Sequence, residues 1–144
     1  MRVRYLLDTN VISEPLRPRP DRALVRKLRQ HQSVLALGSP VWHELVYGCA
    51  RLPASRRREL IEAYLLEVVE PSIPILPYSR EAAAWHARER ARLERSGLSS
   101  SFVDGQIAAI AVVNDLVLVT ANTGHFASFE GLEQESWLSA RRRQ

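Results

Sequence analysis

Acidic residues in three segments far apart along the chain could together hold a metal ion. Asp8 follows an apolar run, Glu44 lies in a segment that begins with Ser39, and Asp104 lies near the start of an alanine-rich stretch. A fourth polar residue, Asn122, follows another apolar run. Oxygen ligands of this kind suit hard divalent cations such as Mg²⁺. The set therefore indicates a metal site.

Converging carboxylates restrict what such a pocket can do. Three of them in one place repel each other and raise their own pKa values, unless a divalent cation or an arginine lies between them. A cation bound there can turn a water molecule into a nucleophile toward a phosphodiester and neutralise charge that develops on the phosphate oxygens. Phosphodiester hydrolysis is therefore the chemistry that this constellation favours.

Strands that alternate with helices would bring these residues together. Buried strands are predicted from apolar runs at residues 3–7, 34–37 and 116–120, and an edge strand, interrupted by Pro74, at residues 73–77. Helices are predicted at residues 21–31, from 39 through Glu44, 55–70, 79–96 and 102–114. Asp8 and Asn122 then follow strand ends, where open parallel sheets bind ligands. The pattern predicts an α/β fold with a central, mostly parallel sheet flanked by helices on both faces.

Length and composition indicate one ordinary globular domain. The chain has 144 residues, of which 46% are hydrophobic and 25% charged, enough for a single core. We expect a single domain over residues 1–138, followed by a flexible basic tail over residues 139–144. Its one cysteine, Cys49, has no intrachain partner and is expected to be a small buried hydrophobic residue.

The sequence gives no sign of a membrane segment. The apolar stretches fall short of the roughly 20 residues that a membrane-spanning helix needs. Arg2 and Arg4 are followed by only three apolar residues before Asp8, unlike a signal peptide. We therefore expect a cytoplasmic protein without membrane contact.

The net charge of +4 comes almost wholly from arginine, whose planar guanidinium group suits phosphate.

Four segments in order resemble those of the PIN-domain ribonucleases, and within them the FitB-like branch of the VapC-type toxins of bacterial toxin–antitoxin pairs. The segments cover residues 7–13, 39–48, 104–111 and 120–126. The resemblance implies a PIN-like fold and a metal-dependent endoribonuclease with Mg²⁺ or Mn²⁺ in an acidic pocket. The family's acidic positions fall on three residues of this chain: Asp8, Glu44 and Asp104.

This chain departs from the commonest family pattern at Asn122. Many members carry an aspartate there, so the pocket has one formal negative charge fewer. An asparagine carbonyl can still ligate a hard cation or hold its water. A second departure is Ser99, where relatives often have proline.

We assign the roles as a hypothesis. Asp8 and Asp104 ligate the metal directly or through water, Glu44 orients or deprotonates the attacking water, and Asn122 is a weak outer ligand. Two supporting residues position the carboxylates by hydrogen bonding: Asn10 and Thr120.

Two other classes of protein stay open. A phosphatase of the haloacid dehalogenase kind also places an aspartate after its first strand, but a second acidic residue is usual two positions later, where this chain has Asn10. The other alternative is a catalytically weak or silent PIN-like module that binds RNA or a protein, which Asn122 and the arginine-rich surface would suit. Metal-dependent RNA cleavage separates this module from the enzyme.

The partners are implied by the resemblance. VapC-like proteins act on RNA, form homodimers and are held inactive by a small antitoxin whose tail covers the acidic pocket. We therefore expect an RNA substrate, a small cognate antitoxin and a homodimer.

Overall fold

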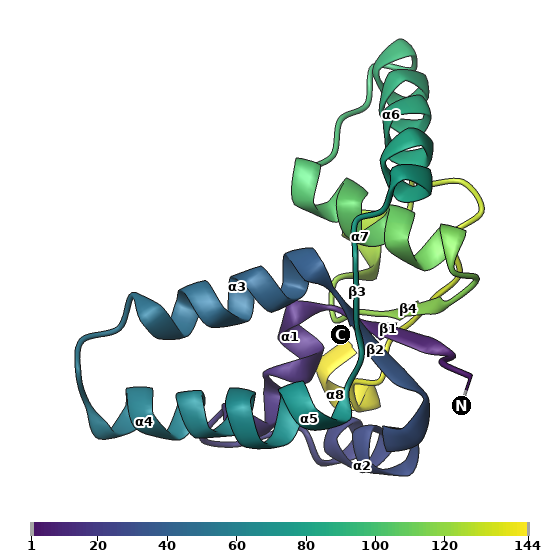
Figure 1. The fold of residues 1–144 in the computed structure, drawn as a ribbon. Helices are drawn as coiled ribbons and strands as arrows, with labels where there is room; N and C mark the ends of the chain where they lie inside the picture. Colours follow the sequence, from purple (N-terminus) through teal and green to yellow (C-terminus); the bar gives the residue numbers. More distant parts are fainter. Residues whose placement is uncertain (1, 144) are drawn as a thin grey trace.

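A parallel five-stranded sheet forms the centre of the molecule within residues 2–143, the part of the chain that the computed structural model describes (Figure 1). The strand order is β3-β2-β1-β4-β5, and each pair of neighbours is parallel. The strands are β1 Tyr5–Leu7, β2 Leu35–Gly38, β3 Ile75–Leu76, β4 Val117–Val119 and β5 Gln134–Glu135. β1 and β2 are fully buried, as expected for strands covered on both faces.

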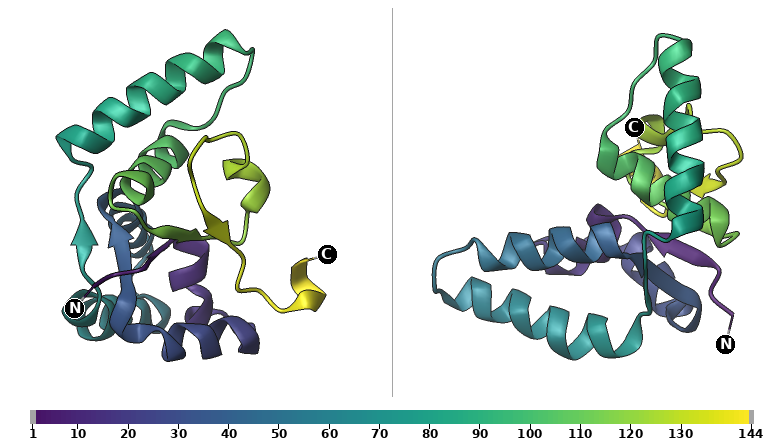
Figure 2. Two further views of the ribbon diagram at one scale, coloured as in Figure 1. Left: turned by 90° about the vertical axis from the view of Figure 1, so that its right-hand side faces the viewer. Right: turned by 45° about the horizontal axis from the view of Figure 1, so that its top comes forward.

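Helices cover the sheet on both sides, which confirms the predicted α/β class. In Figure 1, α6 and α7 lie above the strands, while α1, α2 and α8 lie below them. α3 and α4 run side by side as an arm that projects away from the sheet (Figure 2). The α-helices are α1 Thr9–Ile12, α2 Arg22–Gln30, α3 Ser39–Ala50, α4 Arg56–Ala63, α5 Glu70–Ser72, α6 Arg80–Arg95, α7 Phe102–Val113 and α8 Ala140–Arg143. Within the described residues, no helix has the length and apolar character needed to cross a membrane.

The predicted strands and helices match the observed ones closely, and besides the C-terminal helix α8, described below, two differences stand out. The first is β5, a two-residue edge strand of polar residues, which apolar patterning cannot reveal. The second is the predicted helix over residues 55–70, which is α4 followed by a π-helix, η3 Tyr64–Val69, and then α5. Tyr64 in η3 donates a hydrogen bond of 2.8 Å from its hydroxyl to the carbonyl of Ile12 at the end of α1. The arm is thereby tied to the helix that Asp8 begins.

The segment expected to be a flexible tail contains α8, and the structure gives it an anchor. The Arg142 Nη1 atom lies 2.9 Å from Oε2 of Glu14 and 3.9 Å from Oδ2 of Asp21. Both acidic side chains are almost completely buried, and Ser139 also donates to Asp21 from its amide and its hydroxyl. The domain boundary at residue 138 stays a prediction.

Replacing Arg142 with alanine is expected to lower the free energy of unfolding by about 1–3 kcal/mol. The change removes the cation between two buried carboxylates, and the figure is below that for a fully buried pair because the Arg142 side chain is 36% exposed. Urea denaturation of wild type, Arg142→Ala and Arg141→Ala measures the effect. Arg141 is an exposed neighbour of equal charge, so equal midpoints for the two variants would contradict the anchor.

Candidate metal centre

Asp8 lies where two neighbouring parallel strands end. Its backbone N–H donates to the carbonyl of Val119 at the end of β4 (2.9 Å). Its side chain caps α1, because Oδ1 accepts from the amide of Thr9 (2.8 Å). With the residue only 8% exposed, this carboxylate is held at the carboxyl edge of the sheet, the usual place for ligand binding in such folds.

Thr120 fixes the other oxygen of the same carboxylate. Its hydroxyl donates to Oδ2 of Asp8 over 2.9 Å, between residues 112 positions apart in sequence. Thr120 is completely buried, and its hydroxyl oxygen accepts from the backbone N–H of Asn122 (3.0 Å). Both oxygens of Asp8 are therefore oriented by donors, as carboxylates in metal sites are.

Asp104 lies in the first turn of α7 and is half-buried. Its backbone N–H donates to the Ser101 hydroxyl over 3.0 Å, so Ser101 caps the helix. Sequence reasoning did not single out Ser101, although a serine three residues before an aspartate is a recognised signal for a helix start. The cap fixes where α7 begins and therefore where Asp104 lies.

The electrostatics of Asp8 show that the two aspartates are neighbours. Burial has the largest effect and raises the pKa of Asp8, and the charge of Asp104 raises it further. The hydrogen bonds with Thr120 and Thr9 and the charge of His125 lower it, but the net result is a raised pKa. Two carboxylates whose charges act on each other suit a hard divalent cation between them.

Glu44 lies on α3 and is exposed. It lines a cavity of about 380 Å³ that Val103 and Gln106 of α7 also line, so it faces the turn that carries Asp104. Its carboxylate has no hydrogen bond to the described residues. Over residues 2–143, no three or more His, Cys, Asp or Glu side chains lie close enough to hold a metal ion by themselves. The structure therefore brings Asp8 and Asp104 together, whereas Glu44 lines a cavity beside the first turns of α7 and does not join them in one cluster.

The remaining expected residues, Asn122 and Asn10, differ in how far they are buried. Asn122 is half-buried and Asn10 is exposed, and neither side chain hydrogen-bonds to any residue that the structure describes. His125 follows Asn122 in η4 Thr123–Phe126, and its charge lowers the pKa of Asp8.

Comparison with known proteins gives consistent matches over most of the chain. The family model for the PIN domain matches residues 5–132. VapC ribonuclease Y4jK of Sinorhizobium fredii is 35% identical over 124 residues, which cover 84% of this chain and 89% of the relative. Toxin FitB of Neisseria gonorrhoeae is 35% identical over 127 residues, with the same two coverages.

Solved structures agree with these matches. A structure of FitAB bound to an IR36 DNA fragment superposes with a TM-score of 0.86 at 29% identity, covering 94% of this chain and 96% of that one. FitAcB from Neisseria gonorrhoeae gives a TM-score of 0.83 at 32% identity, covering 90% and 95%. VapBC2 from Rickettsia felis, bound to promoter DNA, gives 0.79 at 27% identity, covering 92% and 98%.

Proposed function

Since the chain belongs to the PIN-domain family, we propose that it is a VapC-type endoribonuclease toxin that hydrolyses RNA phosphodiester bonds with Mg²⁺ or Mn²⁺. VapC ribonucleases and the FitB toxin are its relatives. The phosphatase alternative has no support from this family membership. The catalytically silent alternative is decided by the experiment below.

One observation carries the proposal. The Asp8 carboxylate is almost completely buried, within reach of the charge of Asp104, and its two oxygens accept from two donors. Burying a charge in this way costs free energy unless a counter-charge is supplied. A divalent cation held by Asp8 and Asp104 would supply it, and would bring a phosphate to the same place.

The residues of the chain then have distinct tasks. Asp8 and Asp104 would hold the cation, which would supply stabilisation of the charge that develops on the phosphate oxygens. Thr120 keeps Asp8 in one orientation through its 2.9 Å hydrogen bond. Asn122 offers an amide oxygen at the outer edge of the site. Its neutral side chain leaves the pocket less negative than an aspartate would.

Glu44 is proposed to handle the proton of the attacking water. An exposed carboxylate at the rim of an open cavity can accept a hydrogen bond from a water molecule and take its proton as the oxygen attacks phosphorus. The bond from phosphorus to the leaving ribose oxygen breaks, and that oxygen is protonated from solvent. Glu44 needs no contact with Asp8 for this task.

The test is cleavage of a structured RNA pool by the purified, antitoxin-free chain. We expect cleavage with Mg²⁺ or Mn²⁺, none in EDTA, and recovery when the metal is added back in excess. RNA that is bound but never cut with either metal would support the silent binding module instead. Cleavage that is insensitive to EDTA would contradict the role given to the metal.

Replacing Thr120 with valine is expected to reduce cleavage or metal affinity about 10–100-fold, the usual cost of losing a residue that orients a metal ligand. Valine keeps the shape but cannot donate to Asp8. Cleavage rates measured against Mg²⁺ concentration, compared with Thr123→Val, give the effect. Thr123 is an exposed threonine of the same loop, so equal activities of the two variants would contradict the role of Thr120.

We further propose a small cognate antitoxin and a homodimer. The solved FitAB and VapBC structures are toxin–antitoxin complexes. Co-purification of the tagged chain with the product of an adjacent small gene, followed by light scattering, tests both. A monomeric chain that inhibits growth equally with and without that product would contradict them.

A further inference from the structure

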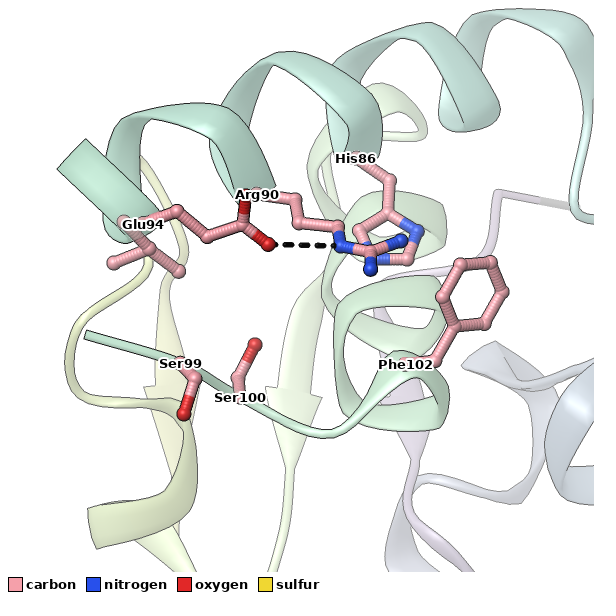
Figure 3. Close-up of a pocket in the computed structure, with 7 residues that line it drawn as sticks. His86, Arg90, Glu94, Ser99, Ser100 and Phe102 are labelled. Carbon is pink, nitrogen blue, oxygen red and sulfur yellow. Dashed lines mark hydrogen bonds and ion pairs between the residues drawn. The ribbon is translucent and has the colours of Figure 1, made fainter. Parts of the chain in front are cut away.

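We propose that the cavity between α6 and the segment leading into α7 binds one nucleotide of the RNA strand beside the cleaved bond, with a phosphate on Arg90 and a base on Phe102. This inference rests on the ribonuclease function proposed above and names a substrate contact for it. The cavity is lined by α6, by the loop that follows it and by the first residue of α7 (Figure 3).

The cavity is large enough for a phosphate group. Its volume is about 150 Å³, whereas a single water molecule needs roughly 10–15 Å³ on the same measure. It is open to solvent along the loop, because Ser99 and Ser100 are exposed. A phosphate on a continuing strand could therefore enter and leave it.

Arg90 supplies the charge. Its Nε atom lies 3.3 Å from Oε2 of Glu94, but both side chains are about 60% exposed. An exposed pair of this kind is weak, so a phosphate can displace the carboxylate. The two terminal nitrogens of Arg90 have no hydrogen-bond or ion-pair partner within the part of the chain that the structure describes. A guanidinium with free, parallel donors suits phosphate.

Phe102 offers a platform for a base. The residue is 53% exposed, and Cζ of Arg90 lies 5.7 Å from the centre of its ring. The ring of His86 packs against Phe102 at 4.8 Å. His86 is only 3% exposed, and its Nδ1 lies 2.8 Å from the hydroxyl of Tyr78. The buried His86 therefore backs the Phe102 ring, and exposed aromatic rings of this kind are what bases of single-stranded nucleic acid stack on.

The loop before α7 adds a donor to the cavity and also connects the cavity with the metal centre. Figure 3 shows the Ser100 hydroxyl pointing toward the Arg90–Glu94 pair, and this hydroxyl has no hydrogen bond to any described residue. The next residue, Ser101, caps α7, and Phe102 shares the first turn of that helix with Asp104. An RNA strand whose scissile phosphate lies at Asp104 would therefore place its neighbouring nucleotide at the cavity.

Burial and then the charge of Arg90 lower the pKa of His86, so its imidazole is neutral near pH 7. Arg90 is the cation of the cavity and Glu94 its anion, among the side chains that line it. One cation next to one exposed aromatic ring matches one nucleotide, which carries a phosphate and a base, better than it matches free inorganic phosphate. This favours an RNA strand over a small phosphate ligand.

The test measures binding apart from cleavage. In an Asp8→Asn background, fluorescence anisotropy follows a short fluorescein-labelled oligouridylate over a range of salt concentrations, with and without Arg90→Gln, Phe102→Ala or Phe102→Leu. Arg88→Gln is the matched control, since Arg88 is an exposed arginine of the same helix that lies outside the cavity. Thermal melting of each variant verifies folding.

We expect Arg90→Gln to reduce the slope of log affinity against log salt by about 0.7, the value for one phosphate contact on a single strand. Phe102→Ala should weaken binding roughly five- to 150-fold, as the loss of one base stack does, and Phe102→Leu should also weaken it. Arg88→Gln should leave both quantities unchanged. Unchanged binding and slope in folded Arg90→Gln and Phe102→Leu would overturn the proposal. Failure of the nuclease function would show separately, as wild type that binds the oligonucleotide without cutting RNA.

Discussion

Asp8→Asn is expected to reduce RNA cleavage at least about a thousandfold, since a metal ion's stabilisation of transition-state charge is worth several kcal/mol and each 1.4 kcal/mol is a factor of ten. The substitution keeps the shape of the side chain. The asparagine oxygen can still accept from the Thr9 amide, and its amide can donate to the Thr120 hydroxyl. The fold is therefore kept while one metal ligand loses its charge.

The matched control for this change is Asp115→Asn. Asp115 is exposed and has a φ of 56°, a left-handed conformation that asparagine tolerates well. Cleavage rates under saturating Mg²⁺ and melting temperatures are compared for both variants and wild type. Cleavage by Asp8→Asn at a rate similar to that of Asp115→Asn would mean that Asp8 is not a metal ligand.

The second large effect is expected from Gly105→Ala, with a loss of about 2 kcal/mol in the free energy of unfolding. Gly105 is buried in α7, and a Cβ atom there would collide with Nε2 of His86. His86 cannot move away easily, because it is buried in α6 and bound to Tyr78. The collision would outweigh the roughly 1 kcal/mol by which alanine favours a helix over glycine.

The same substitution should lower cleavage about a hundredfold. Asp104 precedes Gly105, so a shift of α7 displaces a metal ligand, and a displacement of about 1 Å in an active site costs about that factor. Gly48→Ala is the control, since a Cβ at that helical position meets no atom within 4 Å. In a double-mutant cycle, His86→Ala combined with Gly105→Ala should lose less stability than the sum of the two single changes. Additive losses, or a melting temperature for Gly105→Ala equal to that for Gly48→Ala, would contradict the collision.

The fold was largely predictable because its signals are local. Apolar runs marked four of the strands, and caps such as Asp21 and Ser79, which accept from the amides of Leu24 and Ala82, marked helix starts. β5 could not be predicted, since its pairing with β4 depends on the rest of the sheet and not on its own polar residues.

The candidate site was predictable in its composition but not in its geometry. Strand order places Asp8 at the carboxyl edge, and this follows from the alternation of strands and helices. The burial of Asp8 and the exposure of Glu44 depend on packing between distant segments, as does the bond from Thr120 to Asp8. The same holds for Arg142, whose partner Glu14 lies 128 residues away in sequence. Spacing in the sequence carries no information on such contacts.

The most direct test of the central claim, that Asp8 and Asp104 together hold a divalent cation, is calorimetric titration of Mn²⁺ into the purified chain. Wild type and Asp115→Asn are expected to bind the ion with equal affinity. Asp8→Asn and Asp104→Asn should each bind it at least about tenfold more weakly, because each removes a charged oxygen ligand. Equal affinity in all four proteins would show that the ion binds elsewhere, and the absence of binding to wild type would contradict the metal centre itself.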